Sequence, residues 1–170
     1  MPSYTSDASG LRAFQAAKLV QDGSVWVAIG KTSPWNEGET VPVVTSDMTL
    51  QETVAFKRAD QIAFVVKDDK GTIEQRGQKW RILKSDEAKA TDCRHVYVQA
   101  WLNYDEFPLV TYRQTGVYAG LVLKSGVAAN EQVVTLEDIV DVGYLLVLNN
   151  RSPIQRDATQ KESLDFIIEF

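Results

Sequence analysis

The chain ends on an alternation of apolar and polar side chains, in residues 164–170, which read LDFIIEF. In an extended segment one face carries Leu164, Phe166, Ile168 and Phe170, and the other carries Asp165, Ile167 and Glu169. Burying four large apolar side chains contributes about 6–12 kcal/mol, as much as the net stability of a typical domain. Because chain ends fray unless they are held, we expect a final strand docked in a core or completed by a neighbouring subunit.

Other apolar runs with the spacing of strands are interrupted by turns rather than by regular helices. The expected strands fall at 25–30, 61–66, 95–104, 112–123 and 142–148. Helical spacing over 11–21 places Leu11, Phe14 and Ala17 on one inward side. Further helical segments are expected at 50–58, after a capping box of Thr49 and Glu52, and at 135–138. This order predicts an α+β, β-rich fold of mainly antiparallel, sandwich-like sheets with two or three short helices.

Length and charge favour one soluble domain. The chain has 170 residues with a net charge of −5, and we expect residues 1–170 to form a single domain with residues 1–9 disordered. An acidic balance argues against nucleic-acid binding, which needs clustered lysine and arginine. No apolar run approaches the length of a membrane span, and the first residues do not resemble a secretory signal. We therefore expect a protein made in the cytoplasm, without membrane or nucleic-acid partners.

The segment Gly30–Lys31–Thr32 follows an expected strand and invites comparison with a phosphate-binding loop. That motif needs a second glycine five positions earlier, where this chain has Val25, and a helix afterwards, which Pro34 prevents. We interpret the segment as a strand end with a solvated lysine.

Cys93 and His95 are the only cysteine and the only histidine of the chain. A zinc site needs four such ligands, so we interpret the two as a buried structural pair rather than a metal site or a nucleophile with its base. Residues 68–74, DDKGTIE, lack the alternating acidic ligands of a calcium loop, because Lys70 occupies one ligand position. We expect a solvated hairpin tip there. We expect no catalytic, cofactor-binding or metal-binding residue and no cofactor.

The four tryptophans divide into two groups. Trp26, Trp80 and Trp101 lie in expected strands and are expected to fill the core. Trp35 lies in a turn-rich loop beside Pro34. Its ring either packs as a lid over the core or contacts a partner, since tryptophan is enriched at the energetic centres of interfaces.

Several segments together resemble a known family. They are VAIGKTSPW (27–35), TSD (45–47), YVQAWLNYDEFP (97–108), YRQTGVYAGLVL (112–123) and the closing LVLNNRSPIQRDATQKESLDFIIEF (146–170). In this order they resemble the baseplate wedge subunits of contractile-tailed bacteriophages, the T-even-like peripheral wedge protein family, from about residue 10 to the end. Relative to the T-even member the chain is shortened, with a large inserted domain missing at 67–94.

The resemblance implies a β-rich, sandwich-like fold with flanking helices, no catalysis, a homodimer, and packing against other baseplate wedge and tail proteins. The function expected from it is that of a structural subunit of a contractile phage tail baseplate wedge, assembled in the host cytoplasm and located in the virion. The alternative is a small β-rich carbohydrate- or ligand-binding accessory module that uses exposed aromatic rings such as Trp35 and Tyr104. An enzyme built around His95 is a third reading.

Overall fold

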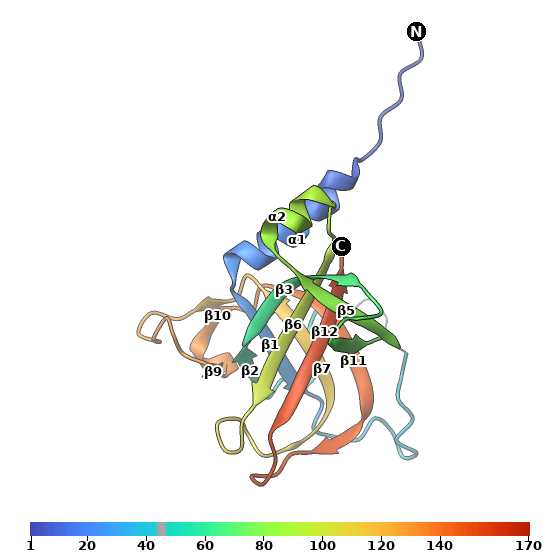
Figure 1. The fold of residues 1–170 in the computed structure, drawn as a ribbon. Coiled ribbons are helices and arrows are strands. Elements are labelled where there is room, and N and C mark those ends of the chain that lie inside the picture. The colour runs from blue at the N-terminus through green and yellow to red at the C-terminus, as the bar shows by residue number, and fades with distance from the viewer. Residues whose placement is uncertain (44–46) are drawn as a thin grey trace. The chain divides into compact units, whose positions relative to one another are not determined.

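The structure, a computed structural model, describes residues 1–43 and 47–170 and separates into two compact units (Figure 1). Unit 1 consists of Met1–Gly23, Gln61–Val98 and Asp165–Phe170, and unit 2 of Ser24–Asp60 and Gln99–Leu164. Two predicted features fall partly on residues 44–46, outside the described residues: the helix start at 45–47 and the end of the 31–45 loop. The sheets are antiparallel wherever a strand register is given, and two α-helices accompany them, so the chain is β-rich.

Unit 1 begins with α1, Ser9–Asp22, which residues 1–8 precede as an exposed extended segment (Figure 1). The helix ends where Gly23 turns into the left-handed region, at φ 62°, and donates its N–H to Leu19 O at 3.3 Å. The short helix α2, Ser85–Ala90, carries two carboxylates in its first turn, which favour the positive end of the helix dipole. No helix is predicted there from the sequence.

The sheet of unit 1 has the strand order β12-β6-β3-β5-β4. The strands are β3 (Gln61–Lys67), β4 (Ile73–Gln75), β5 (Gln78–Leu83), β6 (His95–Leu102) and β12 (Glu162–Glu169). By the residue ranges, β6 and β12 each continue from unit 1 into unit 2. Side chains from both ends of the sheet reach one cluster, formed by Val65, Trp80, Tyr97 and Ile167 with Ile73 packed against it. The cluster therefore runs across the sheet from one edge strand to the other.

The predicted final strand is β12, and Leu164 and Ile168 are buried as predicted, but other positions differ from the expectation. Ile167, predicted on the polar face, is only 2% exposed and belongs to the cluster of unit 1. Phe166 and Phe170, predicted on the buried face, are half-buried. The Arg76 guanidinium donates to Ile167 O at 2.9 Å, which holds the strand from the β4–β5 turn. The strand has buried residues on both faces, so alternation alone did not identify all of its buried positions.

The main sheet of unit 2 has the order β11-β7-β1-β2-β9. Its strands are β1 (Val25–Gly30), β2 (Ala55–Arg58), β7 (Thr111–Ala119), β9 (Val133–Val134) and β11 (Tyr144–Gln155). Every residue of β1 is buried, as its continuous apolar run predicts for a central strand. The core cluster consists of Trp26, Ala28, Leu50, Phe56, Tyr118, Leu121, Val134 and Ile139.

A second, two-stranded sheet of unit 2 pairs β8 (Val122–Leu123) with β10 (Ile139–Asp141). The 3-10 turn η1, Leu136–Asp138, comes directly before β10. Its capping box is the one predicted from the sequence: the Asp138 carboxylate accepts the Thr135 N–H at 2.8 Å. The predicted capped turn at 135–138 is therefore confirmed.

The helix predicted at 50–58 is wrong, because this segment forms a turn followed by the strand β2. Phe56 packs edge-to-face on Tyr118, with ring centroids 5.2 Å apart, and it pairs with Ala28 across the sheet. Leu50 donates its backbone N–H to the Tyr118 hydroxyl at 2.9 Å. These long-range contacts outweigh the local capping pattern, which contributes only about 1 kcal/mol.

A buried arginine fixes the loop that follows β6. The Arg156 side chain is fully buried, and its guanidinium donates to four backbone carbonyls, those of Leu102, Asn103, Tyr104 and Pro108, at 2.9–3.3 Å. The Glu162 carboxylate lies 3.7 Å from it and balances its charge. A planar, always-charged guanidinium suits this role because it presents five donors in a fixed geometry.

In the described ranges no helix is long and apolar enough to cross a membrane.

The tryptophan assignment gives a test of the fold. Trp80 is 2% exposed and donates its indole N–H to Gln75 O at 3.0 Å, whereas Trp101, predicted in the core, is 39% exposed beside Lys161. We expect Trp80→Ala to lower the free energy of unfolding by about 3–5 kcal/mol. Trp101→Ala should lower it by about 1 kcal/mol or less. Urea denaturation of both variants measures this, and equal losses would contradict the placement of Trp101.

Candidate interaction surfaces

Cys93 and His95 both lie in unit 1, and their side chains contact different groups. The buried Cys93 Sγ lies 3.3 Å from Val65 O and 3.5 Å from His95 O, so the thiol is directed at backbone carbonyls. The His95 ring packs beside Trp80, at 5.2 Å between centroids, and its Nε2 is 3.7 Å from Glu169. Burial is the main cause that lowers the pKa of His95, against the opposing effect of Glu169. The imidazole is therefore neutral at neutral pH.

The acidic segment 68–74 forms a turn whose leading carboxylate is already occupied. Asp68 accepts the Lys70 backbone N–H at 2.9 Å and an Arg81 N–H at 2.9 Å. These two hydrogen bonds hold the pKa of Asp68 below its usual value. Within residues 1–43 and 47–170, no three side chains of the metal-binding types come together as a possible metal site.

The segment Gly30–Lys31–Thr32 is built for packing against a neighbouring loop. A Cβ at Gly30 would lie 2.5 Å from Gln51 O, so the glycine permits close approach of two backbones. The prediction that Lys31 is solvated is wrong, because its side chain is only 13% exposed. Its Nζ lies 2.8 Å from Ser33 Oγ and 3.2 Å from the Glu52 carboxylate. The lysine therefore fastens two loops together.

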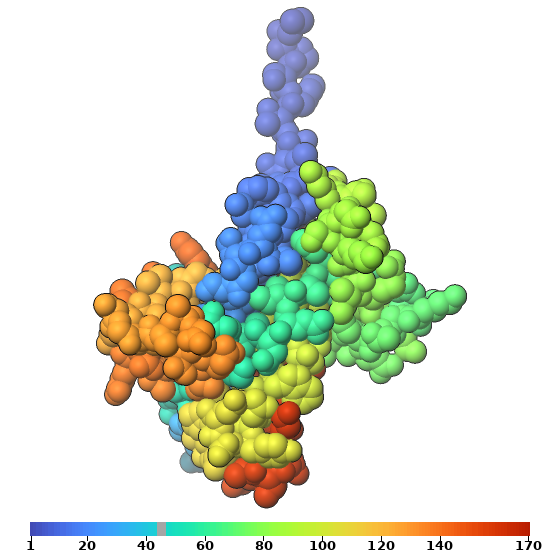
Figure 2. All heavy atoms as spheres, turned by 60° about the vertical axis from the view of Figure 1, so that its left-hand side comes forward, coloured from blue at the N-terminus to red at the C-terminus, as the bar shows by residue number. Residues whose placement is uncertain are grey.

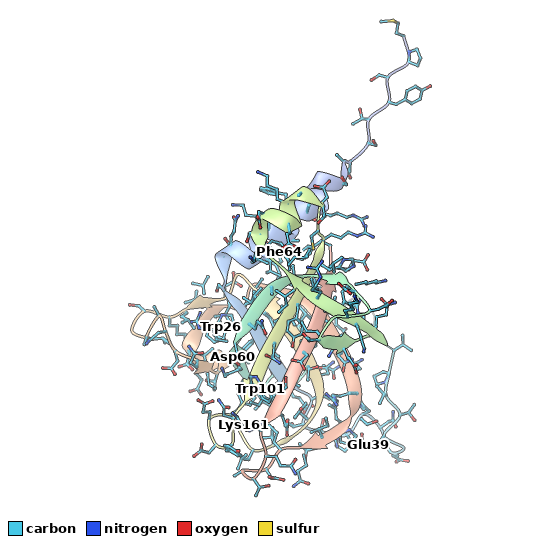
Figure 3. All side chains as sticks on the ribbon, in the orientation of Figure 1. Trp26, Glu39, Asp60, Phe64, Trp101 and Lys161 are labelled. Atoms are coloured by element: carbon cyan, nitrogen blue, oxygen red, sulfur yellow. The ribbon has the colours of Figure 1, made fainter. Side chains whose placement is uncertain are left out.

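The loop after Lys31 is held by an ion pair that the sequence did not reveal. Arg113 in β7 makes a two-pronged contact with the Glu39 carboxylate, at 2.7 Å from Nη2 and 3.0 Å from Nε, and donates to Thr32 O at 2.6 Å. The Arg113 side chain is buried, whereas Glu39, labelled in Figure 3, is about one-third exposed. Hydrogen bonding to Arg113 is the main cause that lowers the pKa of Glu39.

Trp35 packs as a lid at this loop. Its indole N–H donates to Arg151 O in β11 at 3.0 Å, and the Lys31 ammonium lies 5.6 Å from its ring centroid. The Asn150 side chain donates to Pro42 O at 3.1 Å and ties the far end of the loop. Of the two roles weighed for Trp35, the structure thus favours packing within the chain.

An apolar groove between α1 and α2 is a surface that the sequence did not predict. Its volume is about 580 Å³, and its walls include Ala13, Phe14, Val20, Phe64 and Ala88. In Figure 2, α1 (blue) and α2 (light green) lie next to each other on the face in view. Polar walls are a minority, so the groove presents mainly apolar surface.

The helix α1 faces the opposite way from the prediction, and side chains of its outward side, such as Phe14, line the groove. The helix buries Ala16 and Leu19, whereas Leu11 and Phe14, predicted to face inward, are exposed, Phe14 to 60%. Helical spacing shows that two apolar stripes exist, but it does not show which of them the rest of the chain covers. The helix therefore presents an apolar side to solvent.

A second apolar surface, the ribbon patch, lies on the β8–β10 sheet and its surroundings in unit 2. Its members are large side chains that are half or more exposed: Val122, Leu136, Val140 and Tyr144. Ile139 of the same ribbon is buried in the core cluster, whereas the next residue, Val140, is exposed. Exposed apolar surface of this kind marks contact sites in proteins that assemble.

Sequence comparison places these surfaces in context. The sequence profile of a family described as "Baseplate wedge 3 tail fiber network component" matches residues 4–170. The chain belongs to this family. The resemblance to baseplate wedge subunits inferred from the sequence is therefore confirmed, and the protein is a phage virion component that resides in the baseplate.

A relative agrees with membership of the baseplate wedge 3 family. "Virion protein 3" of Enterococcus phage phiEF24C is 28% identical over 154 residues, which cover 85% of this chain and 83% of the relative. The family's description implies contact with other baseplate proteins. The apolar groove and the ribbon patch are the described surfaces best suited to such contacts.

The Arg113–Glu39 pair predicts a pH-dependent loop anchor. The pKa of Glu39 is below its ordinary 4.5 in the folded protein, so its stabilising effect is complete above about pH 4.5 and is lost as the pH falls through the lower folded value. Glu39→Gln should therefore be less stable than the wild type at pH 7, and the difference should shrink below about pH 4. Urea denaturation across pH measures this.

Glu37→Gln serves as the matched control for this experiment, because Glu37 is an exposed carboxylate of the same loop. It should match the wild type at every pH. A stability difference between Glu39→Gln and wild type that is as large at pH 3 as at pH 7 would contradict an anchoring role for the Glu39 charge.

Proposed function

We propose that this chain is a structural subunit of a contractile phage tail baseplate wedge that acts by protein–protein assembly without catalysis. The family match over residues 4–170 carries the proposal. The exposed apolar side of α1 supports it, because a helix side of this kind is stabilised by a neighbour that removes it from water. Other baseplate wedge and tail proteins are the proposed partners, met in the host cytoplasm before the chain resides in the virion.

The proposal includes no catalytic, cofactor-binding or metal-binding residue. What supports this is that titratable groups hold neighbouring segments together. The Glu39 and Asp68 carboxylates accept hydrogen bonds from arginine side chains. The Glu52 carboxylate forms an ion pair with Lys31. We further propose that residues 10–170 act as one domain with a sandwich-like arrangement of sheets.

The carbohydrate-binding alternative is less favoured because Trp35, its main candidate ring, is half-buried and hydrogen-bonded to Arg151 O.

The proposed homodimer would use the groove between α1 and α2. In a twofold dimer the same patch meets itself, so it must contain both a projecting group and a recess. Phe14 projects to 60% exposure beside a recess of about 580 Å³ with small walls at Ala13, Ala17 and Ala88. Two copies related by a twofold axis could each insert Phe14 into the other's groove.

A genetic experiment tests the assembly role. A nonsense mutation early in this gene, grown with and without the protein supplied in trans, should give particles that lack a complete baseplate only when the protein is missing. Electron microscopy of purified particles and mass spectrometry of their proteins measure this. Particles with a complete baseplate in the absence of the chain would contradict the proposed function.

The dimer is tested separately by Phe14→Glu. A charge placed in an apolar interface is unfavourable unless it is paired, so this variant should be a folded monomer where the wild type is a dimer. Val43→Glu, an exposed apolar position in unit 2, is the matched control and should remain dimeric. Native mass spectrometry gives the masses and circular dichroism gives the fold. A monomeric wild type, or a Phe14→Glu variant that stays a dimer, would remove this interface.

A further inference from the structure

A pocket of unit 2 combines positive charge with a buried donor that has no acceptor. The pocket lies beside β8 at the end of the β1–β2 pair where Trp26 is opposite Arg58, and it has a volume of about 370 Å³. Its walls include Trp26, Arg58, Leu121, Val122 and Lys124. Trp26 of β1 is labelled in Figure 3. The family membership does not account for this arrangement, and neither the groove of unit 1 nor the Glu39 loop contributes to it.

Arg58 is held rigidly in place but not by a carboxylate. Its Nε donates to Glu131 O at 3.2 Å and its Nη2 to Ala129 O at 2.9 Å, while its guanidinium carbon lies 4.3 Å from the Trp26 ring centroid. Among the described residues, no carboxylate lies within ion-pair distance of this guanidinium. The backbone thus positions a cation whose charge is left unmatched, which prepares it to receive an anion without further ordering.

Lys124 adds a second cation at the same pocket. It is exposed, and within the described part of the chain no carboxylate is in ion-pair distance of its ammonium. The carboxylates of Asp138 and Asp141, in the segment that pairs with β8, accept hydrogen bonds from Thr135 and Gly143 instead. In a chain with a net charge of −5, two unmatched cations beside one pocket are a local reversal of charge.

The indole N–H of Trp26 is the second observation that points to a bound group. Trp26 is 1% exposed, and its Nε1 has no hydrogen-bond acceptor in the part of the chain that the structure describes. A buried donor without an acceptor costs about 1–3 kcal/mol, and such groups are few in native proteins. The Nε1 atom itself is inaccessible to solvent, so an acceptor from outside reaches it only when neighbouring side chains shift as a ligand enters.

Apart from Ser24, the other walls of the pocket are apolar side chains, and they continue into the ribbon patch through Val122. The neighbouring ribbon-patch side chain Tyr144 is 78% exposed and approaches Gly120, the residue just before Leu121. A ligand that enters the pocket therefore meets hydrogen-bond donors flanked by apolar surface. This arrangement is common at the centres of protein–protein contacts.

We propose that this pocket receives the carboxylate of an aspartate or glutamate, flanked by apolar residues, on another protein of the baseplate. The carboxylate pairs with Arg58 and Lys124, and its entry brings an acceptor to the Trp26 side of the pocket. The inference rests on the proposed assembly function and names the chemistry of one partner. A second copy of this chain is disfavoured at this position, because twofold pairing over the pocket would place its two cations against their own copies.

The first experiment uses a peptide probe on the full-length protein. N-acetyl-Leu-Glu-Val-amide is titrated against ¹⁵N-labelled protein while the indole N–H signal of Trp26 is followed by NMR, with the Gln-containing peptide as the matched control. The Glu peptide should shift the Trp26 signal saturably and the Gln peptide should not. Lys124→Gln should weaken the binding about two- to fivefold, as for an exposed ion pair. Lys161→Gln, which removes a lysine beside Trp101, should leave it unchanged.

Two results would overturn the proposal. One is an unmoved Trp26 signal at saturating peptide, and the other is an equal shift with both peptides. Arg58→Gln is a second variant that should abolish the binding. Because Arg58 also holds two backbone carbonyls, its fold is checked by circular dichroism, and the exposed Lys124 variant keeps the test decisive if Arg58→Gln does not fold.

The second experiment separates this inference from the proposed function. Wild-type protein and Lys124→Glu, distinguished by mass, compete for incorporation into particles in the same infected culture. The wild type should be enriched over Lys124→Glu in purified particles, and Lys161→Glu should be incorporated at the wild-type level. Equal incorporation of Lys124→Glu and wild type overturns the pocket. Absence of the wild type itself from particles contradicts the proposed function instead.

Discussion

The pairing of β7 with β1 on one side and β11 on the other is the interaction on which unit 2 depends. β7 is buried over almost its whole length, including charged and polar side chains that would be costly there without partners. Three of these side chains, those of Arg113, Gln114 and Tyr118, form hydrogen bonds with loops. The Gln114 amide accepts the Gln51 N–H at 2.7 Å and donates to Asn150 at 2.8 Å. Tyr118 and Arg113 do the same for the loops at Leu50 and Glu39.

Close packing at this strand explains a further constraint. A Cβ at Gly116 would lie 2.6 Å from Leu50 Cδ1 and 2.9 Å from Leu145 Cδ1, so a larger residue would displace both of these side chains. The loop that carries Leu50 therefore sits against the sheet. This explains why 50–58 does not form the helix that its capping residues favour. The long-range contacts of this segment with β7 and β1 outweigh its local preference.

Sequence reasoning succeeded where a pattern has one physical solution and failed where it has two. The continuous apolar run of β1 fits only a central strand, and the last alternation fits a strand, β12. The prediction of which side of α1 faces inward was wrong, because both sides of the helix carry apolar residues. Only tertiary packing determines that Ala16 and Leu19 are the buried ones. Lys31 was expected in water for the same reason: the partner that buries it, Glu52, is distant in the sequence and its role is invisible there. The unmatched Arg58 and the Trp26 donor could not be predicted either, because an unpaired group is defined by what does not approach it.

The division of the chain into interleaved pieces has a consequence for heredity. The backbone passes between the two units four times, at 23–24, 60–61, 98–99 and 164–165, and two of these passages run inside the continuous strands β6 and β12. A single crossover within the gene therefore yields a hybrid in which at least one unit combines segments from both parents. Exchange of this gene among phages is thus favoured as a whole gene, and hybrids within it must preserve matching strand partners on both sides of the junction.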